Sequence, residues 1–323
     1  MAKKSWMYSV LEAVQYEMRA DKNMVWFFEL TPPVAATPGK PVINLEKEFG
    51  RERVVNTGID EMWMAAATLG AGLAGSKAAT YIPYQGNGMC FQIIQNHAGK
   101  LRSMTGGVAS MPVVFILEMT GQTPGFAGQH SDYEIDTYYA HIPGVRTVIP
   151  STPHDAKGMM HAAIRSPDPV VYLYPAGLRE LMEEVPDEAY TTPLDKAVVR
   201  MTGSDITIVG SGGGMPEVMA GAEKLKAQGM KPEVIDLRSL KPMDTESLVK
   251  SVQKTKRLLT VDQSYYTLCP GAEVIARVAE NVYGAHFKRV AFPDAPPPAS
   301  PEMFLWMKPN ADHVVAAAKK LVG

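Results

Sequence analysis

The feature that most restricts the fold is an alternation of two kinds of segment in residues 205–282. Short runs such as DITIVG and RLLTVD are mainly apolar and indicate buried strands. Between them lie segments of about 10 to 15 residues with helical spacing, such as TESLVKSVQKT. This alternation is typical of βαβ units, in which helices join parallel strands. The sequence therefore predicts an α/β domain with a parallel sheet in this half.

The first half of the chain shows the same alternation less regularly, with apolar runs that predict strands at 78–84, 112–119, 145–150 and 169–174. Residues 182–197 carry several charges and two prolines without a clear period, which is typical of a connection between domains. We therefore predict two doubly wound α/β domains with mostly parallel sheets. They comprise residues 1–185 and 201–323, with a linker at 186–200. The proline-rich tail at 292–309 is expected to be irregular.

Composition and charge exclude several classes of protein. The chain is 46% hydrophobic and 20% charged with a formal net charge of -2, which gives no electrostatic reason to bind nucleic acid or an anionic membrane. Its 2 cysteines are too few for a disulfide framework. The most apolar stretch, residues 62–75, is about 14 residues long, shorter than the roughly 20 that cross a bilayer. We expect a soluble, cytoplasmic protein.

A cluster of glycines follows the first strand of the second half, in GSGGGM at residues 210–215. Gly210 and Gly212 match the first two positions of the G-x-G-x-x-G dinucleotide fingerprint. Met215 occupies the third, where packing of the helix on the strand requires glycine or alanine. We interpret the motif as a tight strand-to-helix turn, with a nicotinamide or flavin site as the alternative.

Two residues are candidates for catalysis from their local sequence alone. His130 lies in GFAGQHSDYE, where the neighbouring glycines allow a tight turn or a close approach to a ligand. Histidine also titrates near neutral pH. Glu61 lies at the start of a predicted helix, where a carboxylate also complements the helix dipole without any further role. A surface turn and a helix-dipole contact therefore remain alternatives at this point.

Longer motifs resemble one enzyme family. The run AHIPGVRTVIPSTPHDAKGMMHAAIRSPDPVVYLY resembles beta subunits of the thiamine-diphosphate-dependent decarboxylating component of 2-oxoacid dehydrogenase complexes. FGRERVVNTGIDE is similar to the family's segment that leads to a cofactor-activating glutamate, and GQHSDYE to its active-site histidine loop. EVIDLRSLKPMD and FPDAPPP in the second half are similar too. The resemblance covers nearly the whole chain and implies a transketolase pyrimidine-binding domain followed by a transketolase C-terminal-like domain.

The resemblance implies roles for three residues. In these enzymes a carboxylate beside the aminopyrimidine favours its imino tautomer, whose nitrogen deprotonates the thiazolium carbon, and the resulting ylid attacks a 2-oxo acid. Glu61 corresponds to that carboxylate. His130 corresponds to the histidine that steers protons and helps to pass the acyl group to a lipoyl arm. Tyr84 is expected to keep an aromatic contact with the pyrimidine.

The resemblance also implies partner chains. The Gly-Asp-Gly motif that usually binds the diphosphate through Mg²⁺ does not occur in the sequence. A separate alpha subunit is therefore expected to hold the diphosphate and Mg²⁺, in a heterotetramer of two alpha and two beta chains. A lipoyl acyltransferase core is a further expected partner. Alone, the chain is expected to be inactive.

A structural potassium ion and an altered substrate are further implications. The family binds potassium through carbonyl groups near the segment AAIRSPD, which assigns Ala163, Ile164 and Asp168 to the ion, although Ser166 stands where aspartate is common. Residues 27–30 read FFEL where many members read Gly-Glu-Asp-Val. EMTGQTPGFAG replaces a stretch that usually begins with arginine. These departures favour a divergent substrate or an acyl acceptor other than lipoate.

Two alternatives to a dehydrogenase subunit remain. One is the C-terminal half of a split transketolase-like enzyme that acts on a ketose or another ketone, although PGVRTVIPSTPHDAKG favours the dehydrogenase branch. The other is a catalytically inactive scaffold subunit, which the presence of both Glu61 and His130 disfavours.

Overall fold

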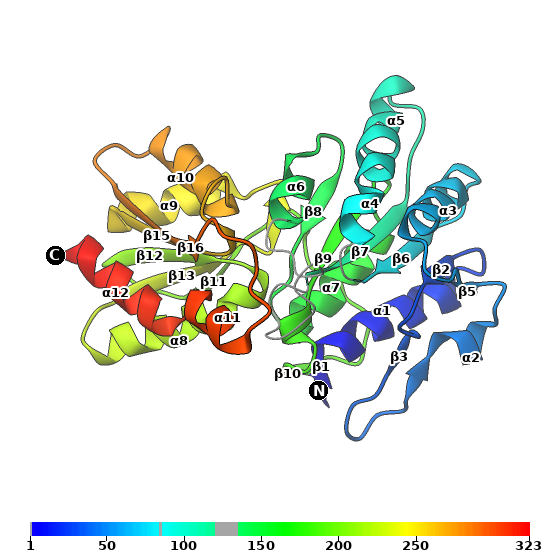
Figure 1. Ribbon diagram of the computed structural model, residues 1–323, viewed down its shortest axis with the longest axis horizontal. Helices are drawn as coiled ribbons and strands as arrows, with labels where there is room; N and C mark the ends of the chain where they lie inside the picture. Colours follow the sequence, from blue (N-terminus) through cyan, green and yellow to red (C-terminus); the bar gives the residue numbers. More distant parts are fainter. Residues whose placement is uncertain (1, 84–85, 120–134) are drawn as a thin grey trace. The chain divides into compact units, whose positions relative to one another are not determined.

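The computed structural model describes residues 2–83, 86–119 and 135–323. The described residues divide into two compact units, the first within residues 2–119 and 138–194, and the second within residues 135–137 and 195–323. Each unit has its own sheet with helices on both faces (Figure 1). The predicted α/β class with two mostly parallel sheets is therefore confirmed.

Six parallel strands of the first unit lie side by side in the order β8-β9-β7-β6-β2-β5. Every residue of the two central strands β6 and β7 is buried, as their continuous apolar sequences predict. The bounds of the six strands are β2 (Val25–Phe28), β5 (Val54–Asn56), β6 (Ala78–Ile82), β7 (Val113–Met119), β8 (Arg146–Val148) and β9 (Val170–Pro175).

Two long helices, α1 (Trp6–Ala20) and α7 (Pro153–Ile164), pack together on one face of this sheet. Ser5 caps α1 by accepting the Tyr8 N–H at 3.2 Å, and Trp6 stacks on the Tyr174 ring with the ring centroids 4.8 Å apart. The helices on the other face are α3 (Glu61–Leu73), α4 (Gly86–Gln92) and α5 (Gly99–Met104), with a π-helical stretch, Ile93–Ala98, between α4 and α5. Short elements complete this half of the chain: β1 (Ala2–Ser5), β3 (Val34–Ala35), β4 (Ile43–Asn44), α2 (Leu45–Phe49), α6 (Ile135–His141) and β10 (Met182–Val185).

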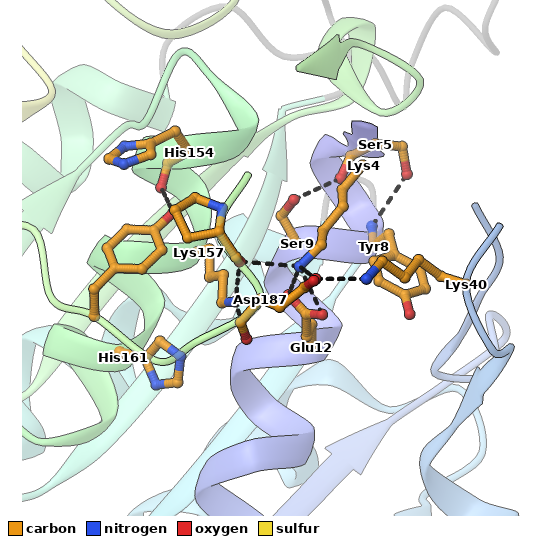
Figure 2. A network of polar contacts seen from close by, with 12 residues as sticks. Lys4, Ser5, Tyr8, Ser9, Glu12, Lys40, His154, Lys157, His161 and Asp187 are labelled. Carbon is orange, nitrogen blue, oxygen red and sulfur yellow. Dashed lines mark hydrogen bonds and ion pairs between the residues drawn. The ribbon is translucent and has the colours of Figure 1, made fainter. Parts of the chain in front are cut away.

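A cluster of charges joins α1, α7 and the segment that follows β10 (Figure 2). The Glu12 carboxylate lies 2.7 Å from the Lys4 ammonium and 2.8 Å from the Lys157 ammonium. Both ammonium groups also donate to the carbonyl oxygen of Pro186, at 3.0 and 2.7 Å. The Asp187 carboxylate lies 2.9 Å from Lys4. The two buried lysines therefore tie residues 186 and 187 to the first unit.

The sheet of the second unit has the order β11-β13-β12-β15-β16, in which β11 is the single antiparallel edge strand. Helices α8 (Met215–Ala227) and α12 (Ala311–Val322) pack together on one face, and α9 (Thr245–Thr255) and α10 (Pro270–Ala279) lie on the other. The strand bounds are β11 (Val198–Met201), β12 (Ile206–Gly210), β13 (Pro232–Asp236), β15 (Arg257–Tyr265) and β16 (His286–Phe292), with a short β14 (Ser239–Lys241) after β13.

The proline-rich tail differs from its prediction. It contains a helix, α11 (Pro301–Met307), whereas the sequence predicts an irregular segment. Ser300 caps this helix by accepting the Met303 N–H at 3.4 Å, and proline at the first helical position costs no hydrogen bond. Phe304 anchors the helix because its ring packs on the buried Phe292 with centroids 6.0 Å apart. Serine followed by proline and glutamate is a typical helix start, but the surrounding prolines indicate a loop.

The interpretation of the glycine motif as a tight turn is confirmed. The glycines at 212–214 form one 3-10 turn between β12 and α8, the tight turn expected for GSGGGM. In the segment 186–200, which the sequence predicts to be a linker, residues 186–197 form neither helix nor strand, and residues 198–200 belong to β11. Across the described ranges, no helix is long and apolar enough to span a membrane.

Candidate active site

Carboxylates gather at the carboxyl ends of two neighbouring parallel strands in the first unit. β2 pairs in parallel with β5 from Trp26 to Phe28. Glu29 follows β2 directly, and Asp60 and Glu61 follow β5 after a short turn. Ligands of open α/β sheets bind outside the carboxyl ends of the strands, so these carboxylates lie where a site is expected.

The turn between β5 and α3 fixes the position of Glu61. The Asn56 side chain accepts the Gly58 N–H at 3.0 Å, and Gly58 has a φ of +69°, which favours glycine. Asp60 then caps α3 by accepting the Trp63 N–H at 2.9 Å. Glu61 is the first residue of the helix, where the positive end of the helix dipole stabilises a carboxylate.

The side chain of Glu29 is fully buried and contacts this turn. One carboxyl oxygen, Oε2, accepts the Asp60 N–H at 3.1 Å. The other, Oε1, is buried without a hydrogen-bond partner in the described part of the chain. Burial, and then the negative charge of Glu61, raise the pKa of Glu29 to about 7. Glu29 is therefore able to hold a proton on Oε1 near neutral pH.

The main chain of Glu61 is hydrogen-bonded, whereas its carboxylate is not bonded to any described residue. Its carbonyl oxygen accepts the thiol of Cys90 at 3.2 Å, which ties the first turn of α3 to α4. Burial, followed by the charges of Glu61 and Glu29, raises the pKa of the Cys90 thiol, so the thiol stays a neutral donor. The half-buried Glu61 carboxylate has no hydrogen bond to any described residue. It is held in place by its backbone and left free for a ligand.

Exposed apolar side chains surround the carboxylates. The exposed fractions near Glu61 are 69% for Ile59, 48% for Met62 and 49% for Trp63. The Trp63 ring contacts Phe27 edge-on, with centroids 6.3 Å apart, so it has a fixed position despite its exposure. Large apolar side chains exposed beside a polar site are candidates for contact with another molecule.

The structure describes only some of the other predicted site residues. His130 and Tyr84 lie outside the described residues. Ala163 and Ile164 lie at the buried end of α7 in the first unit.

The turn predicted to bind potassium already has internal partners. The Ala163 carbonyl accepts the Ser166 N–H at 3.1 Å, and the Asp168 carbonyl accepts the Ser166 hydroxyl at 2.9 Å. The Asp168 carboxylate accepts Arg102 Nε–H at 2.6 Å. The ion pair with Arg102 involves the carboxylate of Asp168, whereas the predicted potassium ligands are carbonyl groups, so the assignment of Ala163, Ile164 and Asp168 stays a prediction.

Comparisons with known proteins identify the family. The transketolase pyrimidine binding domain family matches residues 2–180, and the transketolase C-terminal domain family matches residues 195–314. The chain is also 32% identical over 333 residues to the pyruvate dehydrogenase E1 component subunit beta of Bacillus subtilis, covering 100% of this chain and 99% of the relative. The chain belongs to the transketolase-like beta subunits of thiamine-diphosphate-dependent 2-oxoacid dehydrogenases.

Other relatives of this beta subunit have two different names. A pyruvate dehydrogenase E1 component subunit beta from Rhizobium meliloti is 35% identical over 315 residues, covering 95% of this chain and 67% of the relative. An acetoin:2,6-dichlorophenolindophenol oxidoreductase subunit beta from Bacillus subtilis is 32% identical over 332 residues, covering 98% and 96%. The resemblance predicted from the sequence motifs is therefore confirmed.

A solved structure confirms the fold of the beta subunit. It is described as a split gene transketolase, inactive beta4 tetramer, and it matches with a TM-score of 0.77 at 20% identity over 98% of both chains. At this identity the match shows a shared fold only.

Glu29 is a residue of the candidate site that the sequence motifs do not predict. The signal was present, because a charged residue comes directly after the apolar strand VWFF. Glutamate at the carboxyl end of a buried parallel strand points to a binding edge. Its burial and its contact with the Asp60 main chain are visible only in the folded chain.

Proposed function

We propose that Glu61 is the carboxylate that activates thiamine diphosphate in this beta subunit. The observation that supports it most is the free Glu61 carboxylate on a main chain fixed by Asp60 and Cys90. A carboxylate in this situation fits the protonated ring nitrogen of an aminopyrimidine. When bound, thiamine diphosphate supplies the nucleophilic carbon and the electron sink for cleaving a bond beside a carbonyl group.

Glu29 has a supporting role in this proposal. It positions the turn by accepting the Asp60 N–H, and its raised pKa allows it to be neutral when Glu61 is charged. A neutral neighbour avoids the repulsion between two carboxylates that share a site. Glu61 then presents the negative charge to the ring nitrogen, while Glu29 holds a proton at Oε1.

The proposal includes two residues for which the resemblance is the support. His130 steers protons at the reacting end of the cofactor and assists transfer of the acyl group. Tyr84 provides an aromatic contact to the pyrimidine. Residues 1–185 form the pyrimidine-binding domain, 186–200 the linker and 201–323 the assembly domain.

An alpha subunit completes the site in this proposal. The exposed Ile59, Met62 and Trp63 beside Glu61 fit a partner chain that covers them when the cofactor is bound. The described residues contain no group of three or more histidine, cysteine or acidic side chains able to hold a metal ion. In this proposal the partner holds Mg²⁺ and the diphosphate. The assembly is two alpha and two beta chains in the cytoplasm, and a lipoyl acyltransferase core accepts the acyl group.

Calorimetric titration of thiamine diphosphate with Mg²⁺ tests the proposal on this chain alone and with its alpha partner. We expect tight binding only by the pair, and a loss of turnover without loss of assembly in Glu61→Gln. Glu52→Gln, which changes another carboxylate of the same unit, is the matched control. Tight binding by the lone chain would contradict a shared site, and full turnover in Glu61→Gln would contradict the role of Glu61.

The substrate of the pair is proposed to be a 2-oxo acid, and the departures around residues 27–30 and 118–128 favour a divergent one. A ketose or another ketone is the second candidate, suggested by the fold shared with a split transketolase. A screen of both substrate classes with the assembled pair separates them. Turnover of a ketose phosphate without turnover of any 2-oxo acid would select the second candidate.

Potassium is proposed to bind through the main-chain carbonyls of Ala163 and Ile164. Asp168 contributes its main-chain carbonyl in the same way, while its carboxylate stays paired with Arg102. Comparison of the unfolding temperature in potassium and sodium chloride at equal ionic strength tests this ion. Equal unfolding temperatures in the two salts would argue against it.

A further inference from the structure

The glycine motif of the second unit lies at a point where the strand connections change direction. β12 pairs with β13 on one side and with β15 on the other. The chain leaves β12 through α8 toward β13, whereas α9, which leads to β15, lies on the opposite face of the sheet (Figure 1). Between two such strands a crevice opens outside their carboxyl ends, and ligands of α/β sheets bind there.

The loop at this crevice presents backbone without side chains. Residues 212–214 are all glycine, and Gly212 has a φ of +48°, in the left-handed region that favours glycine. The loop leads directly into α8, whose N-terminus has no side-chain cap. Within this turn the Gly214 N–H donates to the Ser211 carbonyl and the Met215 N–H to the Gly212 carbonyl, and Pro216 has no N–H. The N–H groups of Gly212 and Gly213 are therefore the ones that can face a ligand, beside the positive end of the helix.

A buried amide without partners lies against this loop. Gln263 on β15 is 6% exposed, and neither its Nε2 nor its Oε1 has a hydrogen-bond partner among the residues that the structure describes. Its Cγ lies 3.5 Å, and its Cδ 4.0 Å, from where a Cβ of Gly214 would be. Buried polar groups are nearly always paired, so an amide with both ends unpaired indicates a missing partner.

The neighbouring acidic side chains have other partners. Asp262 lies on the opposite face of β15, where it accepts the Gly271 N–H at 3.0 Å. Glu217, in the first turn of α8, accepts the Ala311 N–H at 3.0 Å and lies 4.0 Å from Lys308. Both carboxylates therefore have partners elsewhere than at the Gly212–Gly214 loop.

We propose that this crevice binds a phosphate group. The backbone N–H groups and the end of α8 favour an anion, and Gln263 Nε2 donates to one of its oxygens. Gln263 Oε1 needs a donor, which the hydroxyl of hydrogen phosphate or of a singly protonated phosphate monoester supplies and a fully ionised sulfate does not. The group comes from free phosphate or from a phosphate monoester. The site belongs to the second unit and does not depend on the proposed function of Glu61.

Calorimetric titration of the full chain, prepared without thiamine diphosphate, tests this site. The probes are potassium phosphate, potassium sulfate and glycerol phosphate at constant ionic strength and pH 7. We expect one phosphate per chain, with sulfate bound at least tenfold more weakly. A monoester that binds more tightly than free phosphate identifies a phosphorylated metabolite as the source, and weaker binding identifies the free ion. No binding of either phosphate, or equal binding of sulfate, would overturn the proposal.

Substitution of Gln263 locates the bound ion. Gln263→Leu should weaken phosphate binding at least tenfold, whereas Gln253→Leu, on the exposed side of α9, should leave it unchanged. Because leucine removes two unpaired buried polar atoms, the variant should unfold at no lower temperature than wild type in phosphate-free buffer. Phosphate should raise the unfolding temperature of wild type alone. If leucine does not fit, Gln263→Met provides a flexible apolar alternative. Unchanged affinity in a folded variant would place the anion elsewhere.

Discussion

Glu12 is the most informative single position for the stability of the first unit. Its carboxylate faces two ammonium groups whose side chains are 0% (Lys4) and 2% (Lys157) exposed. After Glu12→Gln, the nearest remaining carboxylate is that of Asp187, which is 56% exposed and contacts Lys4 but not Lys157. Lys157 would then have no carboxylate partner, so its buried positive charge would no longer be balanced by a negative one.

The expected loss follows from that arrangement. Removing one partner of a buried ion pair costs about 3–5 kcal/mol, because the remaining charge stays buried. The amide oxygen of glutamine still accepts a hydrogen bond, so we expect the lower end, about 3 kcal/mol. That is a large share of a typical folding free energy of about 5–15 kcal/mol.

Urea unfolding at pH 7, followed by tryptophan fluorescence, measures this loss. Trp6, Trp26 and Trp63 are all in the first unit, so the signal reports mainly on its unfolding. The control is Glu46→Gln, which removes an exposed ion pair with Arg51 and should cost less than about 1 kcal/mol. A loss below about 1 kcal/mol in Glu12→Gln would refute the reasoning.

A pH series provides a second check on the same variant. Burial is the main cause that lowers the pKa of Lys157, and Glu12 opposes this shift. In the range between the lowered folded-state pKa and the unfolded value of 10.5, the unfolded chain binds more protons, so stability rises with pH. We expect Glu12→Gln to widen this range. The deficit of the variant should therefore shrink at alkaline pH, and a deficit that grows would contradict the mechanism.

Three further predictions concern the site and the backbone. Glu61→Gln should lower kcat of the assembled enzyme by about 100-fold or more, as loss of a proton-transfer group does, and steady-state kinetics measure it. Glu29→Gln should be as stable as wild type below pH 4.5 and more stable than wild type at pH 8. The reason is that the folded-state pKa of Glu29, about 7, makes wild type lose stability as the pH rises between those values. Urea unfolding at the two pH values tests this. Gly144→Ala should cost more than about 3 kcal/mol in thermal unfolding, since its Cβ would overlap the Gly99 carbonyl, whereas Gly39→Ala, with a similar φ but open space around it, should cost about 1 kcal/mol.

The sequence predicts those parts of the fold in which local signals agree with burial. α9 is predicted with its observed bounds because Asp244 caps an amphipathic run that ends before the strand at Arg257. β2 is missed because its four residues, VWFF, are too short to show a period. α11 is missed because prolines indicate a loop, whereas its helix depends on the distant contact between Phe304 and Phe292.

The candidate site was predicted in part, for a similar reason. Glu61 is found from its motif because that motif is contiguous in sequence. Glu29 is separated from Glu61 by 31 intervening residues, and only the parallel pairing of β2 with β5 brings the two carboxylates to one edge. The roles of His130 and Tyr84 remain predictions, because both residues lie outside the described part of the chain.

The lysine cluster has a consequence for any attempt to prepare the first unit by truncation. The chain stays attached to α7 beyond Asp187, because Tyr190 donates to the His154 carbonyl at 2.8 Å and Thr192 to the Gly158 carbonyl at 3.0 Å. A stop codon after residue 185 would remove two main-chain acceptors of the buried ammonium groups. A stop codon after residue 194 would retain every one of these contacts, so the longer fragment is the one to express.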